Sequence, residues 1–181
     1  IGTVYKGIKL SKQKALICGA TGFIGRNITE SFVANDEFEI YGTYLNSEPW
    51  SHSSVKMVRA DLTNPKDVDQ VVQGMDIIIQ AAATTSGAKD IVNKPYYHVT
   101  DNVVMNSLLL RSAYEHSIKH LVFFSCTVMY QSSETPLKES DFDPNQELHK
   151  NYFGVGWTKV YIEKICEFYS RLGHTKHTVI R

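Results

Sequence analysis

A glycine-rich segment near the start of the chain, Gly19 to Gly25, constrains the fold more than any other feature. It directly follows an apolar run at residues 15–18, which predicts a buried strand, and it precedes residues 26–34, whose apolar positions have helical spacing. Glycines between a strand and a helix let the backbone turn tightly and approach a pyrophosphate, which binds to free amides at the helix N-terminus. The segment therefore predicts a phosphate-binding turn.

The side chains of this turn are predicted to have two roles. Phe23 and Ile24 are the apolar members of the turn, and we expect them to face the core. The turn as a whole is predicted to contact a dinucleotide through Gly19, Thr21, Gly22, Phe23, Ile24 and Gly25.

The rest of the chain repeats the alternation of strands and helices. Apolar runs predict further strands at residues 38–41, 55–58, 77–79, 121–124 and from 178 onward. Helical spacing predicts helices at 101–116 and 151–172, and a third helix is opened by Asn64, which can cap it, and Pro65, which fits its first turn. Such alternation predicts an α/β fold, a doubly wound parallel sheet of Rossmann type covered on both faces.

The pattern predicts one NAD(P)-binding Rossmann domain over residues 13–181, preceded by a polar lead-in at residues 1–12. A doubly wound sheet is not expected to end on its last strand. We therefore expect the elements that pack over that edge, and a C-terminal substrate domain, to lie outside this chain.

Charge and cysteine content argue against several classes of partner. Lys plus Arg number 19 and Asp plus Glu number 19, so the net charge of zero gives no general attraction to nucleic acid or to an anionic membrane. No apolar stretch is long enough to cross a bilayer. The 3 cysteines are too few and too scattered for a disulfide framework, so we expect a reducing, cytoplasmic setting.

The residues after the second predicted strand bear on the choice between NAD and NADP. A carboxylate at this position holds the ribose 2′-hydroxyl of NAD, whereas a basic residue accepts the 2′-phosphate of NADP. The segment that contains Tyr44 and Asn46 has no carboxylate before Glu48. Arg26 can reach a 2′-phosphate or can be a solvated arginine on the helix surface, and the two interpretations weigh equally. The balance favours NADP slightly over NAD.

Several later segments resemble the extended short-chain dehydrogenase/reductase family, in particular its nucleotide-sugar epimerase/dehydratase branch and, within that, GDP-L-fucose synthases. The resemblance covers nearly all of the chain after residue 13. Its motifs are the glycine turn, Asp61-Leu62, Ala81-Ala82-Ala83, Asn102, residues 121–126, residues 136–140 and Gly156-Trp157-Thr158-Lys159.

The resemblance implies a function and a set of roles. Asp61 and Leu62 would contact the adenine, and the backbone of residues 81–83 would line the path of the ribose and pyrophosphate. Asn102 would belong to the same cofactor site, and Lys159 would bind the nicotinamide ribose and lower the pKa of a catalytic tyrosine. The implied reaction is hydride transfer at a sugar carbon of a nucleotide-sugar substrate, with Tyr as acid or base and Ser or Thr orienting the substrate oxygen.

The two proton-handling positions depart from the family pattern. The family tyrosine stands four residues before the lysine, where this chain has Val155. The strand-five Ser or Thr aligns with Cys126, or with Thr127 or Ser125 if the register slips by one residue.

Three interpretations of this departure remain open. In the first, Tyr152 replaces the family tyrosine, since it lies seven residues before Lys159 and on nearly the same helical face. In the second, Cys126 carries the chemistry, although a buried thiol is more often a small core residue. In the third, the domain binds a dinucleotide without turnover, as a pseudoenzyme or regulatory subunit. Because the lysine and the nucleotide-binding segments are retained, an enzyme is the preferred interpretation. A structural subunit without nucleotide affinity is a weaker alternative.

Other patterns have ordinary structural explanations beside functional ones. Spacings of four and three residues in the pairs His116/His120 and His174/His177 suit a metal, but with no third ligand these are interpreted as surface histidines, and no metal site is predicted. The resemblance also implies a homodimer formed by the helices at 101–116 and 151–172. The aromatic residues of those helices face either that partner or the core.

Overall fold

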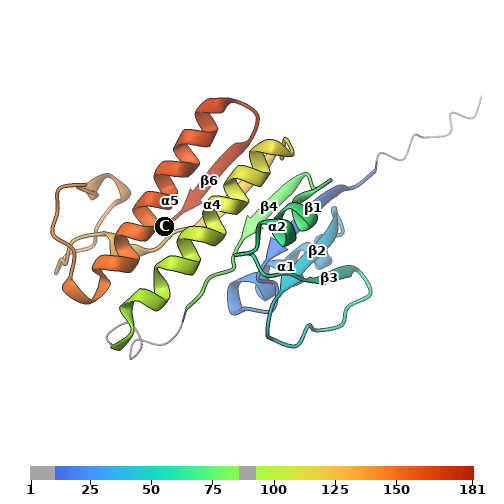
Figure 1. Cartoon of the computed structure of the whole chain (residues 1–181), viewed down its shortest axis with the longest axis horizontal. Coiled ribbons are helices and arrows are strands. Elements are labelled where there is room, and N and C mark those ends of the chain that lie inside the picture. Colours follow the sequence, from blue (N-terminus) through green and yellow to red (C-terminus); the bar gives the residue numbers. More distant parts are fainter. Residues whose placement is uncertain (1–10, 86–92) are drawn as a thin grey trace, which may run out of the picture.

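The computed structural model describes residues 11–85 and 93–181, which form a parallel six-stranded sheet with helices on both faces (Figure 1). The strands lie in the order β3-β2-β1-β4-β5-β6. Their bounds are β1 Gln13–Cys18, β2 Phe38–Tyr44, β3 Val55–Arg59, β4 Ile77–Gln80, β5 His120–Phe124 and β6 Lys176–Ile180. This order reverses direction between β1 and β4, and the doubly wound fold predicted from the sequence is confirmed.

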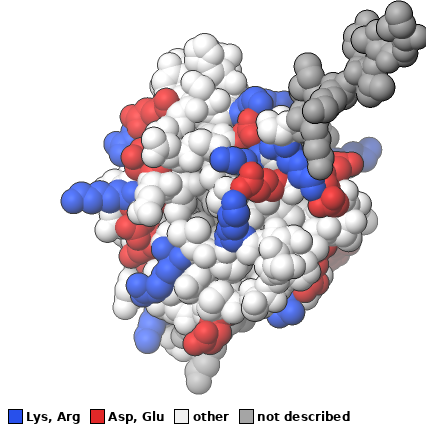
Figure 2. All heavy atoms as spheres, turned by 90° about the vertical axis from the view of Figure 1, so that its right-hand side faces the viewer, with Lys and Arg blue, Asp and Glu red and all other residues white. Residues whose placement is uncertain are grey.

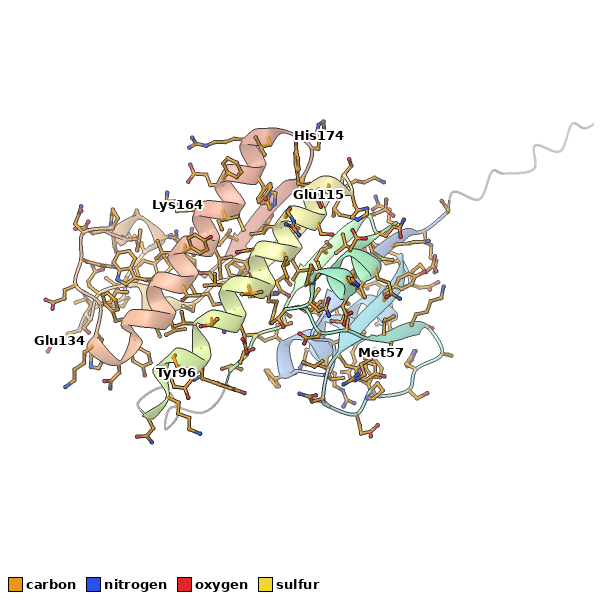
Figure 3. All side chains as sticks on the ribbon, viewed as in Figure 1. Met57, Tyr96, Glu115, Glu134, Lys164 and His174 are labelled. Atoms are coloured by element: carbon orange, nitrogen blue, oxygen red, sulfur yellow. The ribbon has the colours of Figure 1, made fainter. Side chains whose placement is uncertain are left out.

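The helices divide between the two faces of the sheet because alternate strand residues point to opposite sides. Leu16 and Cys18 pack in one core cluster with residues of α2, α4 and α5, whereas Ile17 packs in a second cluster against α1. The bounds are α1 Phe23–Asn35, α2 Pro65–Val72, α4 Thr100–Glu115 and α5 Phe153–Leu172. Figure 3 shows the side chains on the ribbon, with α4 and α5 lying side by side in front of the sheet.

Short 3-10 turns connect several of these elements. They are η1 Pro95–His98, η2 Thr127–Met129, η3 Glu139–Asp141 and η4 Lys150–Tyr152. Of these, η2 follows the end of β5, and η4 leads directly into α5. Apart from η2, η3 and η4, the segment between β5 and α5 has no regular structure.

Element bounds differ from the predicted ones by a few residues, for local reasons. Asn64 caps α2 as predicted, its side chain accepting a hydrogen bond from the backbone amide of Lys66, and Pro65 occupies the first turn. Strand β2 runs three residues further than predicted, to Tyr44, because it stays paired with β3 that far. Helix α5 begins at Phe153 rather than at residue 151, because the preceding residues form η4.

Charge is mixed over the surface, in keeping with the zero net charge. Figure 2 shows acidic and basic side chains interspersed on the face that it presents. Within residues 11–85 and 93–181, no helix combines the length and the apolarity that crossing a bilayer requires.

Candidate functional site

The glycine turn is held against two neighbouring strands by its own backbone. Gly19 has a φ of +72°, and a Cβ at this position would lie 2.7 Å from the Cα of Ala82, after β4. Its amide donates to the hydroxyl of Thr43 on β2 (3.0 Å), and the amide of Ala20 donates to the carbonyl of the same residue (2.9 Å). The turn is thereby fixed between the carboxyl ends of β1, β2 and β4.

Helix α1 starts directly on top of this turn. A Cβ on Gly25 would lie 2.2 Å from the carbonyl oxygen of Gly19, so only glycine fits there without displacing the backbone. No side chain caps the helix at Gly22. The first amides of a helix have no intrahelical acceptor, and uncapped they attract an anion. The turn therefore fits the pyrophosphate of a dinucleotide.

The expectation that Phe23 and Ile24 face the core is wrong. Their exposed fractions are 87% and 47%. The helix begins at Phe23, so these first residues project beyond the edge of the sheet, while Gly25 and Thr29 are the buried residues of α1. Both apolar side chains instead line a cleft.

This cleft of about 660 Å³ runs along the carboxyl ends of β1 to β4. It is lined by residues of the glycine turn and of segments 43–47, 60–63 and 81–85, with Tyr97 from η1 and Asp101 and Met105 from α4. It brings together most of the residues predicted to contact the cofactor: Gly19, Thr21, Gly22, Phe23, Ile24, Tyr44, Asn46, Asp61, Leu62, Ala81, Ala82 and Ala83. Gly25, Arg26, Asn102 and Lys159 were also predicted, and they lie outside its lining.

Asp61 is locked into the wall of the cleft by the residues that follow it. Its Oδ1 accepts hydrogen bonds from the amide (2.9 Å) and the hydroxyl (2.7 Å) of Thr63. These bonds lower the pKa of the Asp61 carboxyl, and the charge of Arg59 adds a smaller contribution in the same direction. The carboxylate is therefore ionised and oriented at neutral pH.

Asn102 acts from behind the cleft. It is buried, its amide group donates to the carbonyl of Thr84 (2.8 Å), and its Oδ1 accepts from the amide of the same residue (3.0 Å). A third bond runs to the carbonyl of His98 (2.9 Å). Asn102 thus joins the backbone after β4 to the start of α4, which makes it a positioning residue for the wall.

Arg26 makes its contacts away from the cleft lining. Its Nε donates to the carboxylate of Glu30 one turn later (2.9 Å), and its guanidinium lies 5.4 Å from the ring centre of Trp50. The indole of Trp50 in turn donates to the carbonyl of Ala20 (3.3 Å).

Lys159 and Cys126 are electrostatic neighbours beyond the end of β5. The ammonium of Lys159 donates to the carbonyl of Phe124 (2.8 Å) and lies over the ring of Phe123 (4.6 Å). Burial lowers the pKa of Lys159. Burial raises the pKa of the Cys126 thiol, although the charge of Lys159 and backbone hydrogen bonds at η2 oppose that shift.

The other catalytic candidates are dispersed. Val155 and Lys159 stand four residues apart in one continuous helix, so the family's tyrosine position is occupied by valine in the structure as in the sequence. Tyr152 precedes α5 and packs its ring beside that of His149 (5.6 Å), so it does not continue the helical spacing to Lys159. Thr127 lines a separate cavity of about 390 Å³.

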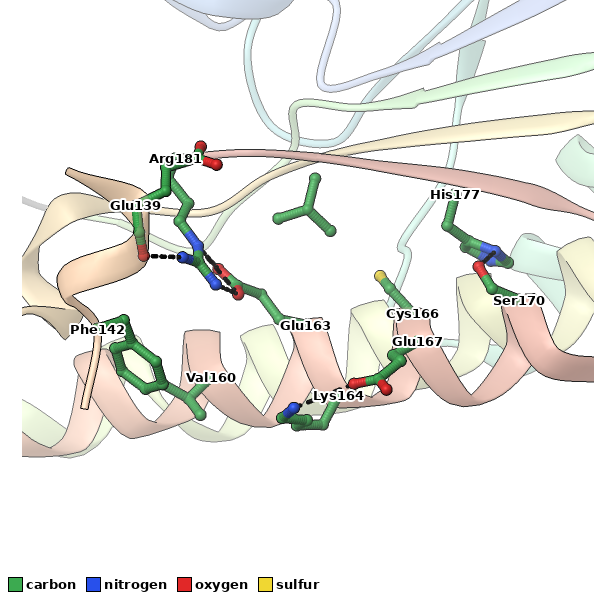
Figure 4. A pocket seen from close by; sticks show the side chains of 11 residues that line it. Glu139, Phe142, Val160, Glu163, Lys164, Cys166, Glu167, Ser170, His177 and Arg181 are labelled. Carbon is green, nitrogen blue, oxygen red and sulfur yellow. Dashed lines mark hydrogen bonds and ion pairs between the residues drawn. The ribbon is translucent and has the colours of Figure 1, made fainter. Parts of the chain in front are cut away.

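A third cavity, of about 330 Å³, lies between α5 and β6 (Figure 4). Arg181 and Glu163 form a salt bridge across it (2.7 Å), and the ring of His177 meets the hydroxyl of Ser170 (3.0 Å). Two other histidines form side-chain hydrogen bonds, His116 with Asp69 and His120 with Thr178. Across residues 11–85 and 93–181, no three His, Cys, Asp or Glu side chains gather in a group that suits a metal.

Thr43 contributes to the site and was not predicted from the sequence. Its hydroxyl fastens the glycine turn, and this contact depends on how β2 lies beside β1, which has no signal in the local sequence pattern. Tyr97 also lines the cleft. In the sequence the Tyr96-Tyr97 pair suits either stacking on a nucleotide or covering the sheet.

Comparisons with known proteins agree with this geometry. Residues 15–181 match the model of the NAD dependent epimerase/dehydratase family. Over 173 residues the chain is 24% identical to an uncharacterized UDP-glucose epimerase of Bacillus subtilis, covering 88% of this chain and 52% of that protein. Over 141 residues it is 29% identical to the GDP-6-deoxy-D-talose 4-dehydrogenase of Aggregatibacter actinomycetemcomitans, covering 76% and 43%. The chain thus spans about half the length of the curated relatives it matches.

Solved structures share the fold. The UDP-glucose 4-epimerase of Thermotoga maritima with UDP-glucose superposes with a TM-score of 0.78 at 18% identity, covering 93% of this chain and 55% of that one. The UDP-glucose 4-epimerase of Thermus thermophilus in complex with NAD gives a TM-score of 0.77 at 20% identity, covering 93% and 54%. At these identities the likeness establishes the fold alone.

The contact between α1 and the turn predicts a sharp difference between two glycines. Gly25→Ala should lower the free energy of unfolding by at least about 2 kcal/mol, because the added methyl group meets backbone that cannot move aside. Gly22→Ala is the matched control, since its Cβ would meet the same carbonyl oxygen at 3.4 Å, an ordinary contact. Urea denaturation of both variants measures the effect, and equal losses would contradict the packing described.

Proposed function

The chain belongs to the NAD-dependent epimerase/dehydratase family, and we propose from this premise that it binds NAD(P) in its cleft and serves hydride transfer at a carbon of a nucleotide sugar. The observation that carries the proposal is the uncapped start of α1 behind the glycine turn, opening into a cleft large enough for a ligand of this class. Relatives named as sugar-nucleotide epimerases and dehydrogenases support the substrate class.

Each wall of the cleft has a role in holding the cofactor. The turn and the first amides of α1 meet the pyrophosphate, Asp61 and Leu62 contact the adenine, and the backbone of residues 81–83 lines the path between them. When bound, NAD(P) supplies the acceptor or donor of the hydride. The bonds of Asn102 to Thr84 keep the wall in place as the ligand enters.

Cys126 and Lys159 are proposed to handle the substrate oxygen and its proton. Because burial raises the pKa of the Cys126 thiol, it keeps its proton at neutral pH and suits hydrogen-bond donation to that oxygen. Because burial lowers the pKa of Lys159, its amine is closer to proton exchange than an exposed lysine. Tyr152 is the less favoured candidate, since it lies outside α5 and against His149.

A second candidate function is dinucleotide binding without turnover. Val155 in place of the family's tyrosine is the observation that favours it, together with the bond of Lys159 to the carbonyl of Phe124. The cleft supports this alternative equally, because it holds the cofactor and not the proton-transfer groups. Turnover separates the two functions.

The cofactor proposal predicts saturable binding of NADPH or NADH in a fluorescence titration of the chain. Gly19→Val should abolish it, because Gly19 has a positive φ and its side chain would overlap the backbone of Ala82. Failure of the unmodified chain to bind either dinucleotide would contradict the proposal. Circular dichroism of Gly19→Val distinguishes a lost site from a lost fold.

The catalytic proposal predicts unequal effects of two substitutions on turnover of a nucleotide sugar. Cys126→Ala should lower kcat by about 100-fold, at the low end of what a proton-handling group contributes. Cys126→Ser should keep most of the activity, since a hydroxyl also donates, and Tyr152→Phe should leave kcat unchanged. The reverse order would assign the chemistry to Tyr152, and absence of turnover with intact cofactor binding would favour the second candidate function.

We also propose that the chain forms a homodimer through α4 and α5. Large apolar side chains recur along one stripe of α5 with fractional exposures of 60% at Phe153, 47% at Tyr161, 54% at Phe168 and 41% at Leu172. Val104 on the neighbouring α4 is 38% exposed. A stripe of this kind on two adjacent helices suits burial against a second copy.

The dimer proposal predicts that Tyr161→Glu combined with Phe168→Glu shifts the molar mass to that of one chain. Two buried carboxylates without partners would cost more than the interface gains. Ser31→Glu is the control, because Ser31 is exposed on α1, which packs on the opposite face of the sheet. Light scattering after gel filtration reports the mass, and an unmodified chain that is already monomeric would overturn the proposal.

A further inference from the structure

One end of the cleft has polar chemistry that the proposed function leaves unassigned. Segment 44–47 begins at the last residue of β2, at the place where this fold recognises the 2′ position of the adenine ribose. It carries no carboxylate before Glu48, so it lacks the group that holds the 2′-hydroxyl of NAD. The neighbouring strand β3 ends in a basic residue, Arg59.

Arg59 is the last residue of β3 and lies directly opposite Tyr44 in the strand register. The amide of Ala60 donates to the carbonyl of Tyr44 (2.9 Å), and the Nε of Arg59 donates to the carbonyl of Leu45 (3.1 Å). Arg59 is exposed and lies outside the cleft lining itself, next to two segments that belong to that lining, 44–47 and 60–63. Its side chain is tied by Nε to the backbone of the first segment.

The remaining edge of the guanidinium is suited to a phosphate. Arginine presents five N–H donors in a planar fork, and a bond at Nε leaves the terminal amino groups for a second partner. Among the described residues, no carboxylate forms a salt bridge with Arg59, although the charge of Arg59 contributes to lowering the pKa of Asp61. A dianionic phosphate beside segment 44–47 would therefore meet a cation that no salt bridge neutralises.

We propose that Arg59 is a specificity-determining residue that recognises the 2′-phosphate of NADP at the rim of the cleft. The inference rests on the proposed cofactor site and assigns its preference. Asn46 and Ser47, which line the same rim, add neutral donors of the kind that accompany arginine at phosphate sites. Arg26 differs from Arg59 in having a carboxylate partner, because its Nε forms a salt bridge with Glu30.

The test compares two pairs of ligands that differ in the 2′-phosphate: NADPH with NADH, and 2′,5′-ADP with AMP. The unmodified chain should bind the phosphorylated member of each pair at least about tenfold more tightly. In Arg59→Ala the affinity for NADPH and 2′,5′-ADP should fall by about 10- to 100-fold, while NADH and AMP change by less than about threefold. Calorimetry measures all four affinities.

Two further variants separate recognition from support of the loop. Arg26→Ala is the matched control and should keep the preference for the 2′-phosphate. Arg59→Lys should restore part of it, since a lysine keeps the charge but loses the planar fork. The affinity ratio is the decisive readout, because a merely structural role in holding Leu45 would weaken all four ligands alike.

The outcomes distinguish this inference from the function beneath it. Equal binding of both members of each pair, or a ratio that Arg59→Ala leaves unchanged, would overturn the role of Arg59 and leave the cofactor site intact. Loss of the preference in Arg26→Ala would transfer that role to Arg26. Absence of binding by all four ligands would overturn the proposed function, and this inference with it.

Discussion

The contact between Gly25 and the carbonyl oxygen of Gly19 is the constraint on which the rest of the site depends. It places the first turn of α1 against the end of β1, and a single added carbon would lie 2.2 Å from that oxygen. Gly42 on the neighbouring strand leaves room for two side chains, since a Cβ there would lie 2.7 Å from the Cβ of Ala20 and 2.8 Å from the sulfur of Met57. At Gly25 the missing side chain lets backbone approach backbone, which directs the helix amides toward the cleft.

Polar contacts then fix the walls around that turn. Thr43 holds the turn from β2, the bonds between Asp61 and Thr63 shape the loop after β3, and Asn102 ties the segment after β4 to α4. Several of these groups are buried, where an unpaired polar atom is costly, so each bond specifies one arrangement of the chain. The site is thus organised before any ligand arrives, which reduces the cost of binding.

The sequence predicted the fold well because the central strands are continuous apolar runs and the turn lies between a strand and a helix. It failed where tertiary placement decides the outcome. Phe23 and Ile24 look like core residues by composition, but the helix starts too early for them to reach the sheet. The spacing predicted that Tyr152 shares a helical face with Lys159, but Tyr152 belongs to η4 and not to α5. Arg59 had no local signal, because its position depends on the register between β2 and β3.

The proposed chemistry of the site depends on how the buried Lys159 behaves when the family's tyrosine is absent. In the family pattern the lysine cation favours a phenolate one helical turn away, whereas here Val155 offers no proton to exchange. The charge of Lys159 is instead shared between the carbonyl of Phe124 and the thiol of Cys126. Burial disfavours both the ammonium and the thiolate, so it lowers the pKa of Lys159 and raises that of the Cys126 thiol. A substrate oxygen that gains negative charge during hydride transfer would oppose the effect of burial on Lys159, because it gives the ammonium an anionic partner.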